Sequence, residues 1–143
     1  MKLESEVWGP HYWFFLHTIS LTYPSRPNDV TKKKYYELIQ NFPIFIPTTT
    51  ASESFQELLN KYPIKPYLDT REAFIKWIYF IHNRVNEKLE KKQITLSNFY
   101  ENYYEHYKRK DIKTKEYYKN VSKFIYFITI ILFIILIYYL SNK

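Results

Sequence analysis

The stretches 8-WGPHYWFFLH-17 and 77-WIYFIHNRVN-86 decide how this chain folds. Apolar residues in and just after the first stretch recur at the spacing of one helix face: Trp8, Tyr12, Phe15, Leu16 and Ile19. The second stretch belongs to a longer segment with the same period, whose apolar stripe consists of Phe74, Trp77, Ile78, Ile81, Val85 and Leu89. Both patterns predict amphipathic helices that bury one face.

The rest of the soluble part also has a helical pattern. Pro10 is tolerated only in the first turn of a helix, so the first helix is predicted to begin near Trp8. Further helices are expected at about 30–41 and 52–61, separated by the proline-interrupted stretch 42–47. A fourth helix is predicted to open with Asp69 as its N-cap and to run to about Lys91. A fifth begins near Leu96 and either ends early or continues into the segment after it.

This pattern predicts an all-α protein: a bundle of four to five helices, followed by a C-terminal transmembrane helix. We expect a helical domain at 1–107, a basic segment at 108–123, a membrane span at 124–140 and a short tail at 141–143. A chain of 143 residues has the size of one domain.

Composition excludes several classes of site. The single glycine, Gly9, argues against a phosphate-binding loop or a dinucleotide-binding fingerprint. The four histidines have no metal-ligand spacing and there is no cysteine, so we expect no metal site. Residue types alone leave a serine hydrolase open, although no G-x-S-x-G stretch supports one.

The net charge of +7 is concentrated in one short segment. Residues 1–107 carry 13 Lys and Arg against 12 Asp and Glu, whereas residues 108–123 carry seven basic residues against two acidic ones. A nucleic-acid-binding domain would place its basic stripe on the folded part. We therefore expect no nucleic-acid partner.

The basic segment precedes an uncharged run at 124–140, rich in Phe, Ile, Tyr and Leu. A helix of this length spans roughly 25 Å, near the lower limit for crossing a bilayer. A buried C-terminal helix is the alternative, but such a helix normally shows a polar stripe. We expect a single-pass tail anchor in a host or virion membrane, with the bundle in the cytoplasm, because the basic residues precede the span. The same residues would lie against anionic head groups or form a solvated linker, and both can hold.

Both quoted stretches carry polar aromatic and amide side chains one turn apart. Trp13 and His17 are four residues apart, as are His82 and Asn86, with Asn83 beside them. Flat aromatic rings, imidazoles and amides suit a ligand with flat faces and a polar edge, such as an isoalloxazine or adenine ring. Each residue alone is more often a hydrogen-bonded core residue, whereas two such motifs together are far more specific.

The two motifs resemble those of the Erv/ALR family of FAD-linked sulfhydryl oxidases, over about residues 7–107. The pattern W-G-x-x-x-W-x-x-L-H matches at Trp8, Gly9, Trp13, Leu16 and His17, and H-N-x-V-N matches at His82, Asn83, Val85 and Asn86. The resemblance implies that these residues, with Trp77, hold FAD in a helical bundle, and that Lys88, Lys91 and Lys92 meet its phosphates. It also implies looser contacts from Tyr36 and from the aromatic run at 99–104. The chain is most similar to small membrane-associated members from large DNA viruses, and relatives of this kind form homodimers.

The chain departs from the family at its redox centre. Where the family has P-C-x-x-C before the third helix, this sequence has Pro47 followed by Thr48, Thr49, Thr50 and Ala51. Thr48 and Ala51 therefore stand at the positions of the two redox cysteines. A threonine hydroxyl does not ionise near neutral pH and does not cycle between two redox states, as a cysteine pair does. We expect no catalytic residue of the family type in this chain.

Two functions follow from these observations. In the first, the chain is a sulfhydryl oxidase family member that oxidises thiols through FAD. It then uses a disulfide supplied by a cysteine-bearing partner, or the flavin takes electrons directly. In the second, it is a cysteine-free relative that keeps the fold, with or without FAD, as a membrane-tethered interaction module. Bound flavin and oxygen uptake on dithiols would separate the two.

Overall fold

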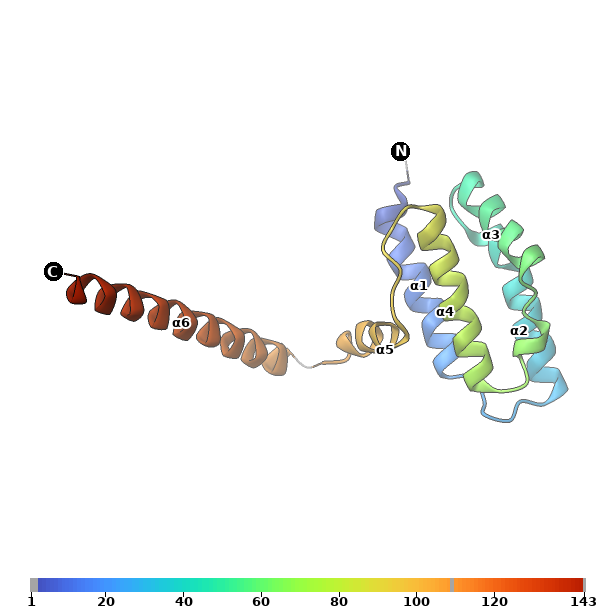
Figure 1. Ribbon diagram of the computed structural model, residues 1–143. Helices are drawn as coiled ribbons and strands as arrows, with labels where there is room; N and C mark the ends of the chain where they lie inside the picture. The colour runs from blue at the N-terminus through green and yellow to red at the C-terminus, as the bar shows by residue number, and fades with distance from the viewer. Residues whose placement is uncertain (1–2, 109, 143) are drawn as a thin grey trace. The chain divides into compact units, whose positions relative to one another are not determined.

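The computed structural model describes residues 3–108 and 110–142 (Figure 1). The basic residue Arg109 and the terminal Lys143 lie outside the described residues. The chain divides into two compact units, one ending at Tyr103 and the other beginning at Tyr104. The described part contains helices and no strand, and these helices are α1 Ser5–Leu21, α2 Asp29–Asn41, η1 Phe42–Phe45, α3 Thr49–Lys61, η2 Lys65–Tyr67, α4 Arg71–Lys88, α5 Leu96–Glu105 and α6 Lys110–Ser141. The predicted all-α class and the apolar C-terminal helix are confirmed.

In the first unit, α1 lies beside α4 (Figure 1), α3 also contacts α4, and both α2 and α3 contact η1. The core consists of side chains that are almost fully buried, among them Leu16 of α1, Ile39 of α2, Leu59 of α3 and Ile78 and Ile81 of α4. The predicted stripe of α4 is buried from Phe74 to Ile81, but Leu89 at its end is 49% exposed, because the helix ends before it. Phe15, expected on the buried face of α1, is 44% exposed.

Two helix starts differ from the prediction. Helix α1 begins at Ser5 rather than near Trp8, so Pro10 lies in its second turn. Proline at this position leaves the carbonyl group of Glu6 without its usual partner, which costs little because Glu6 is exposed to water. Helix α3 begins at Thr49 rather than Ser52. The Ser52 hydroxyl instead donates a 2.7 Å hydrogen bond to the carbonyl of Pro43 and ties α3 to η1.

The N-cap of α4 also differs from the prediction. Thr70, not Asp69, caps the helix, and its hydroxyl accepts a 3.1 Å hydrogen bond from the Ala73 amide. Asp69 is instead paired with Lys32 of α2, with 2.7 Å between the ammonium and the carboxylate. The residue with the stronger capping preference is therefore used for a contact between helices.

Helix α4 ends three residues earlier than predicted, in a backbone motif that turns the chain sharply. The Lys91 amide donates a 2.8 Å hydrogen bond to the carbonyl of Asn86, and the Glu90 amide donates one of 3.1 Å to that of Glu87. This pair of bonds is a Schellman motif, whose central residue is left-handed and usually glycine. Here Glu90 occupies that position with φ 54°. The motif fixes the direction in which Lys91 leaves the helix.

The second unit contains one long helix. Helix α5 ends at Glu105, so it does not continue into the basic segment. Helix α6 joins the basic segment and the predicted membrane span in one unbroken element. Within the described residues, Ile112–Ser141 is long and apolar enough to cross a bilayer, by length and composition alone, and an 18-residue window of it has a mean hydropathy of 2.5.

Candidate functional site between α1 and α4

The central feature of the site is a cluster of three rings where α1 meets α4. The Trp13 ring stacks on the His82 ring, with centroids 4.0 Å apart and planes inclined by 10°. His17, one turn after Trp13 on α1, places its Nε2 3.1 Å from Nδ1 of His82, and one of these nitrogens donates to the other. The two motifs quoted from the sequence therefore meet in space, as their shared chemistry predicted.

Burial makes both imidazoles neutral. It lowers the pKa of His17 from 6.5 to about 4. Burial also lowers the pKa of His82 to about 3, and the neighbouring His17 adds to this effect by charge repulsion. At neutral pH the cluster is therefore an uncharged aromatic surface. Of the two imidazole nitrogens outside the hydrogen bond between the histidines, one donates and the other accepts, which suits a flat polar ring.

Two further aromatic residues surround the cluster. Phe99 of α5 is fully buried and lies 4.3 Å from His17, centroid to centroid. Phe55 of α3 lies 6.4 Å from Trp13. Ala51 precedes Phe55 by one helical turn and so shares its side of α3, while Thr48 is the N-cap residue of the same helix. Ala51 thus lies on the side of α3 that carries Phe55, and Thr48 directly precedes the helix.

The two asparagines of the second motif have different environments. Asn83 is 5% exposed, and its side-chain amide both donates to and accepts from the backbone of Ile94, each at 2.9 Å. Asn86 is 8% exposed, yet within the described residues its side chain has no hydrogen-bond partner. Asn86 is therefore the asparagine with a free amide at the site.

The three lysines that were expected to meet phosphates are also placed differently. Lys88 reaches α3, where its ammonium lies 2.8 Å from the Glu57 carboxylate and 3.1 Å from the Ser54 hydroxyl. Lys91 lies 3.7 Å from the Glu6 carboxylate. Lys92 is exposed. Lys88 would have to leave its carboxylate partner to bind a phosphate, whereas the long Lys91 pair is weak.

Four further residues that were expected to hold FAD lie outside the ring cluster. Trp8 packs edge-on against Tyr12, and an added side chain at Gly9 would meet no atom within 4 Å. Trp77 is a core residue, 2% exposed, and its indole donates to the carbonyl of Tyr62. Val85 packs, half-buried, against the core. Roles for these residues in binding a cofactor stay predictions.

Of the residues that match the family more loosely, some lie next to the ring cluster and others do not. Phe99 borders the cluster, and Tyr103 stacks on Phe14 of α1 with centroids 5.2 Å apart. Tyr36 is 39% exposed. Sequence reasoning missed Phe14 and Phe55 as neighbours of the site. For Phe55 the helical period showed only that it faces inward, and no sequence feature indicates which ring it meets.

Comparison with known proteins identifies the family. The sequence profile described as the Erv1 / Alr family matches residues 10–105, which include all of the second motif and the first motif except Trp8 and Gly9. The chain belongs to the Erv1/Alr family.

Relatives in this family come from viruses and from eukaryotes. The chain is 35% identical over 110 residues to an FAD-linked sulfhydryl oxidase of African swine fever virus, covering 77% of this chain and 87% of the relative. It is 34% identical over 94 residues to the "Probable FAD-linked sulfhydryl oxidase" of Acanthamoeba polyphaga mimivirus, covering 65% of this chain and 66% of the relative. The FAD-binding domain of Erv1 from Saccharomyces cerevisiae has the same fold, with a TM-score of 0.65 at 24% identity, covering 71% of this chain and 95% of that structure.

The neutral histidine pair predicts how the stability of this Erv1/Alr protein depends on pH. In the unfolded chain each histidine binds a proton near pH 6.5, whereas in the fold it does so only near pH 3 to 4. The stabilisation is therefore complete above about pH 6.5 and is lost as the pH falls, by up to about 1.4 kcal/mol per pH unit for each histidine. Urea unfolding followed by tryptophan fluorescence reports on the bundle, since all three tryptophans lie in it.

The variant His82→Phe keeps a ring against Trp13 and should reduce this pH dependence by about half. His106→Gln, at an exposed histidine just after α5, is the matched control and should behave as the wild type. An equally steep loss of stability between pH 6.5 and 4 in His82→Phe would show that other groups cause it.

Proposed function

We propose that this protein is a membrane-anchored flavoprotein of the sulfhydryl oxidase family, which binds FAD at the ring cluster and lacks its own redox disulfide. The observation that carries the proposal is the meeting of Trp13, His17 and His82 between α1 and α4. The Erv1 / Alr family profile matches a segment that contains all three residues, and relatives named FAD-linked sulfhydryl oxidases are 34% and 35% identical to this chain.

The residues present suit this cofactor. The side-chain amide of Asn86 has no partner among the described residues and still reaches solvent, so it is available to a ligand. The stacked rings of Trp13 and His82 present a flat surface, and neutral imidazoles bring no charge to a neutral ring. Lys91 and Lys92 leave α4 on the same turn and supply positive charge for phosphates.

When bound, FAD supplies the capacity to take up and pass on electrons, and the protein supplies the binding site. Trp13 and His82 would hold a flat ring by stacking, with His17 fixing the orientation of the His82 ring through their hydrogen bond. Phe99 and Phe55 exclude water from the far sides of the cluster. The Asn86 amide would form hydrogen bonds with a polar edge of the ligand and so set the orientation of the ligand.

The protein alone has no redox disulfide with which to oxidise thiols. No cysteine is present, and Thr48 and Ala51 stand where the family has its redox pair. A disulfide that exchanges with substrate thiols must therefore come from a cysteine-bearing partner that reaches the start of α3. The absence of cysteine equally favours the second function, in which the bundle is a membrane-tethered interaction module.

We expect the full-length protein, purified in detergent, to carry FAD and to take up no oxygen with dithiothreitol. The double variant Thr48→Cys with Ala51→Cys should then show thiol-dependent bleaching of the flavin, because it restores a C-x-x-C pair at a helix N-terminus, where the thiolate pKa falls. Absorbance spectra and an oxygen electrode measure both properties.

The single variants Thr48→Cys and Ala51→Cys are the controls and should stay inactive as oxidases. Folded wild-type protein that yields no FAD after reconstitution would refute the cofactor proposal. Hydrogen peroxide from wild-type protein with dithiothreitol alone would show that electrons enter by another route. A double variant that binds FAD but stays silent would show that residues 48–51 do not reach the flavin.

The membrane proposal rests on helix α6. Its apolar part lies at the end of the described chain, and its residues are exposed in the second unit. Lys115, Lys119 and Lys123 recur every four residues and form one stripe on the basic part. Lys108 lies 3.1 Å from the nearby Glu116 and neutralises this acidic side chain. We infer that the basic part faces the cytoplasmic head groups and that the bundle lies in the cytoplasm.

Carbonate extraction should leave the full chain in the membrane pellet, because its apolar helix stays in the bilayer. A chain that ends at Lys123 should appear in the supernatant. Protease added outside intact vesicles whose outer face is cytoplasmic should digest the bundle. A protected bundle in sealed vesicles would contradict the orientation, and extraction of the full chain by carbonate would contradict the span.

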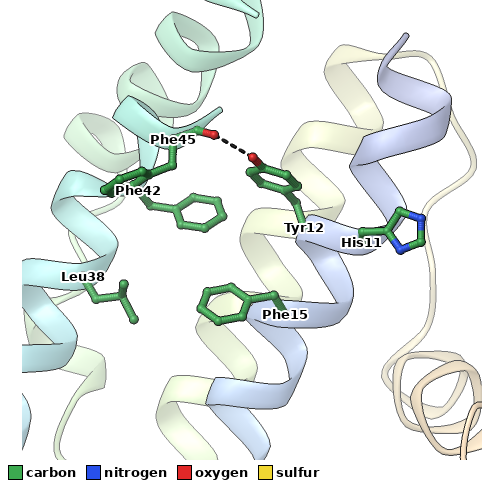
Figure 2. A pocket seen from close by; sticks show the side chains of 6 residues that line it. All are labelled: His11, Tyr12, Phe15, Leu38, Phe42 and Phe45. Carbon is green, nitrogen blue, oxygen red and sulfur yellow. Dashed lines mark hydrogen bonds between the residues drawn. The ribbon is translucent and has the colours of Figure 1, made fainter. Parts of the chain in front are cut away.

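A groove on the first unit is where we place a homodimer contact. It lies between α1, α2 and η1, has a volume of about 360 Å³ and is lined by His11, Tyr12, Phe15, Leu38, Phe42 and Phe45 (Figure 2). Phe15 and Leu38 face each other across it, while the Tyr12 hydroxyl donates a 2.7 Å hydrogen bond to the carbonyl of Phe45. Phe45 is 62% exposed and its neighbour Ile44 is 75% exposed, so an apolar rim remains uncovered in one copy.

The wild-type protein should have the mass of a dimer in light scattering, and Phe45→Glu should convert it to a monomer, because a carboxylate in an apolar contact is strongly unfavourable. Val30→Glu is the matched control, since Val30 is 69% exposed and does not line the groove. A monomeric wild type, or a dimer that persists in Phe45→Glu, would refute the placement of the contact.

A further inference from the structure

Asn83 uses its whole side-chain amide on the backbone of one residue. Its Nδ2 donates to the carbonyl of Ile94 and its Oδ1 accepts from the Ile94 amide, both at 2.9 Å. The residue is 5% exposed. These two bonds imitate the paired bonds between two strands and link α4 to a residue eleven positions later. Both the donor and the acceptor of the Asn83 amide are therefore bonded to the backbone.

We call the two hydrogen bonds between Asn83 and Ile94 the Asn83 clamp. The clamp fixes the far end of the short connection between α4 and α5, whose near end is fixed at the end of α4. The Schellman motif at the end of α4 sets the path as far as Lys91, whose amide bonds to the carbonyl of Asn86. The Asn83 bonds fix Ile94. Only Lys92 and Gln93 lie between these two fixed points. The positions from which Lys91 and Lys92 extend are therefore set largely by backbone hydrogen bonds and one asparagine.

The clamp also sets where α5 begins. Thr95 follows Ile94, and its hydroxyl accepts a 3.1 Å hydrogen bond from the Asn98 amide, which caps the helix. One turn later, Phe99 is fully buried 4.3 Å from His17. A shift of Ile94 would therefore move the helix start, and with it the ring that backs the histidine pair.

We propose that Asn83 is a positioning residue rather than a cofactor ligand: it holds the connection that presents Lys91 and Lys92 and seats Phe99 behind His17. The proposal rests on FAD binding at the ring cluster, as proposed above. It assigns the two asparagines of the H-N-x-V-N motif different tasks, because Asn86 keeps a free amide at the site and Asn83 does not.

The variant Asn83→Asp tests this assignment through its protonation. A neutral aspartic acid has one O–H donor and one carbonyl acceptor, like the asparagine it replaces, whereas the carboxylate has acceptors only and repels the Ile94 carbonyl. Burial raises the pKa of such a group above about 3.9. The titratable groups near this position are Tyr79 and Glu87 one turn away on α4, Lys91 and Lys92 in the connection, and His17 and His82 in the ring cluster. The wild type contains all of them and serves as the reference at each pH.

In the full-length protein we expect the Kd for FAD in Asn83→Asp to be raised about tenfold at neutral pH and to approach the wild-type value as the pH falls to about 5. The amide hydrogen exchange of Ile94, measured without FAD, should be fast at neutral pH relative to wild type after correction for the intrinsic rate, and slow where affinity recovers. Asn83→Ala should bind FAD weakly at every pH. Asn60→Asp, at an exposed asparagine of α3, is the matched control and should match the wild type.

Three results would overturn the proposal. One is wild-type affinity in both Asn83 variants. Another is weak affinity in Asn83→Asp with Ile94 still protected, which would show a direct contact between Asn83 and FAD. The third is affinity in Asn83→Asp that does not respond to pH while Asn83→Ala folds. If the wild type binds no FAD, the proposed function fails, and the exchange of Ile94 still shows whether the clamp exists.

Discussion

The hydrogen bond between His17 and His82, with Trp13 stacked on the second ring, joins α1 to α4 at a point that α3 and α5 also reach. Phe99 of α5 and Phe55 of α3 pack on this cluster, so it holds together elements from both ends of the bundle sequence. His17 is buried and Trp13 and His82 are partly buried, which keeps both imidazoles uncharged at neutral pH. An apolar pair at these positions would pack without that constraint, so stability alone does not explain why histidines stand here.

The sequence predicted the helices from the period of the apolar residues, because burial of one face requires that period wherever the helices lie. It did not predict which capping residue would be used, because Asp69 is drawn away by Lys32 of a helix 37 residues earlier. The left-handed backbone conformation of Glu90 was also not predicted, because glutamate is not a residue typical of such a turn. Local rules therefore failed where a long-range contact or a backbone motif competed with residue preference.

The candidate site shows the same division. The spacing of the two motifs predicted that Trp13, His17 and His82 belong to one site, and the fold places their rings in contact. The pattern could not separate ligand from scaffold, however: Trp77 lies in the core with its indole bonded to Tyr62, and Lys88 is paired with Glu57. Whether a motif residue faces a cavity or the interior depends on its rotation about the helix axis relative to neighbouring helices, and the partner of each face is set by tertiary structure.

Helix α6 runs without a break from Lys110 to Ser141, so its lysines are tied to the apolar part at fixed distances along the axis. With a rise of 1.5 Å per residue, each step from Lys123 to Lys119 to Lys115 adds roughly 6 Å. Charge interactions in physiological salt decay over about 8 Å. Next to an anionic surface, the three lysines would therefore contribute unequally, and neutralising Lys123 by acetylation would weaken that attraction far more than the same modification of Lys115. The contribution of each lysine to membrane attraction therefore decreases with its distance along the helix from the apolar part.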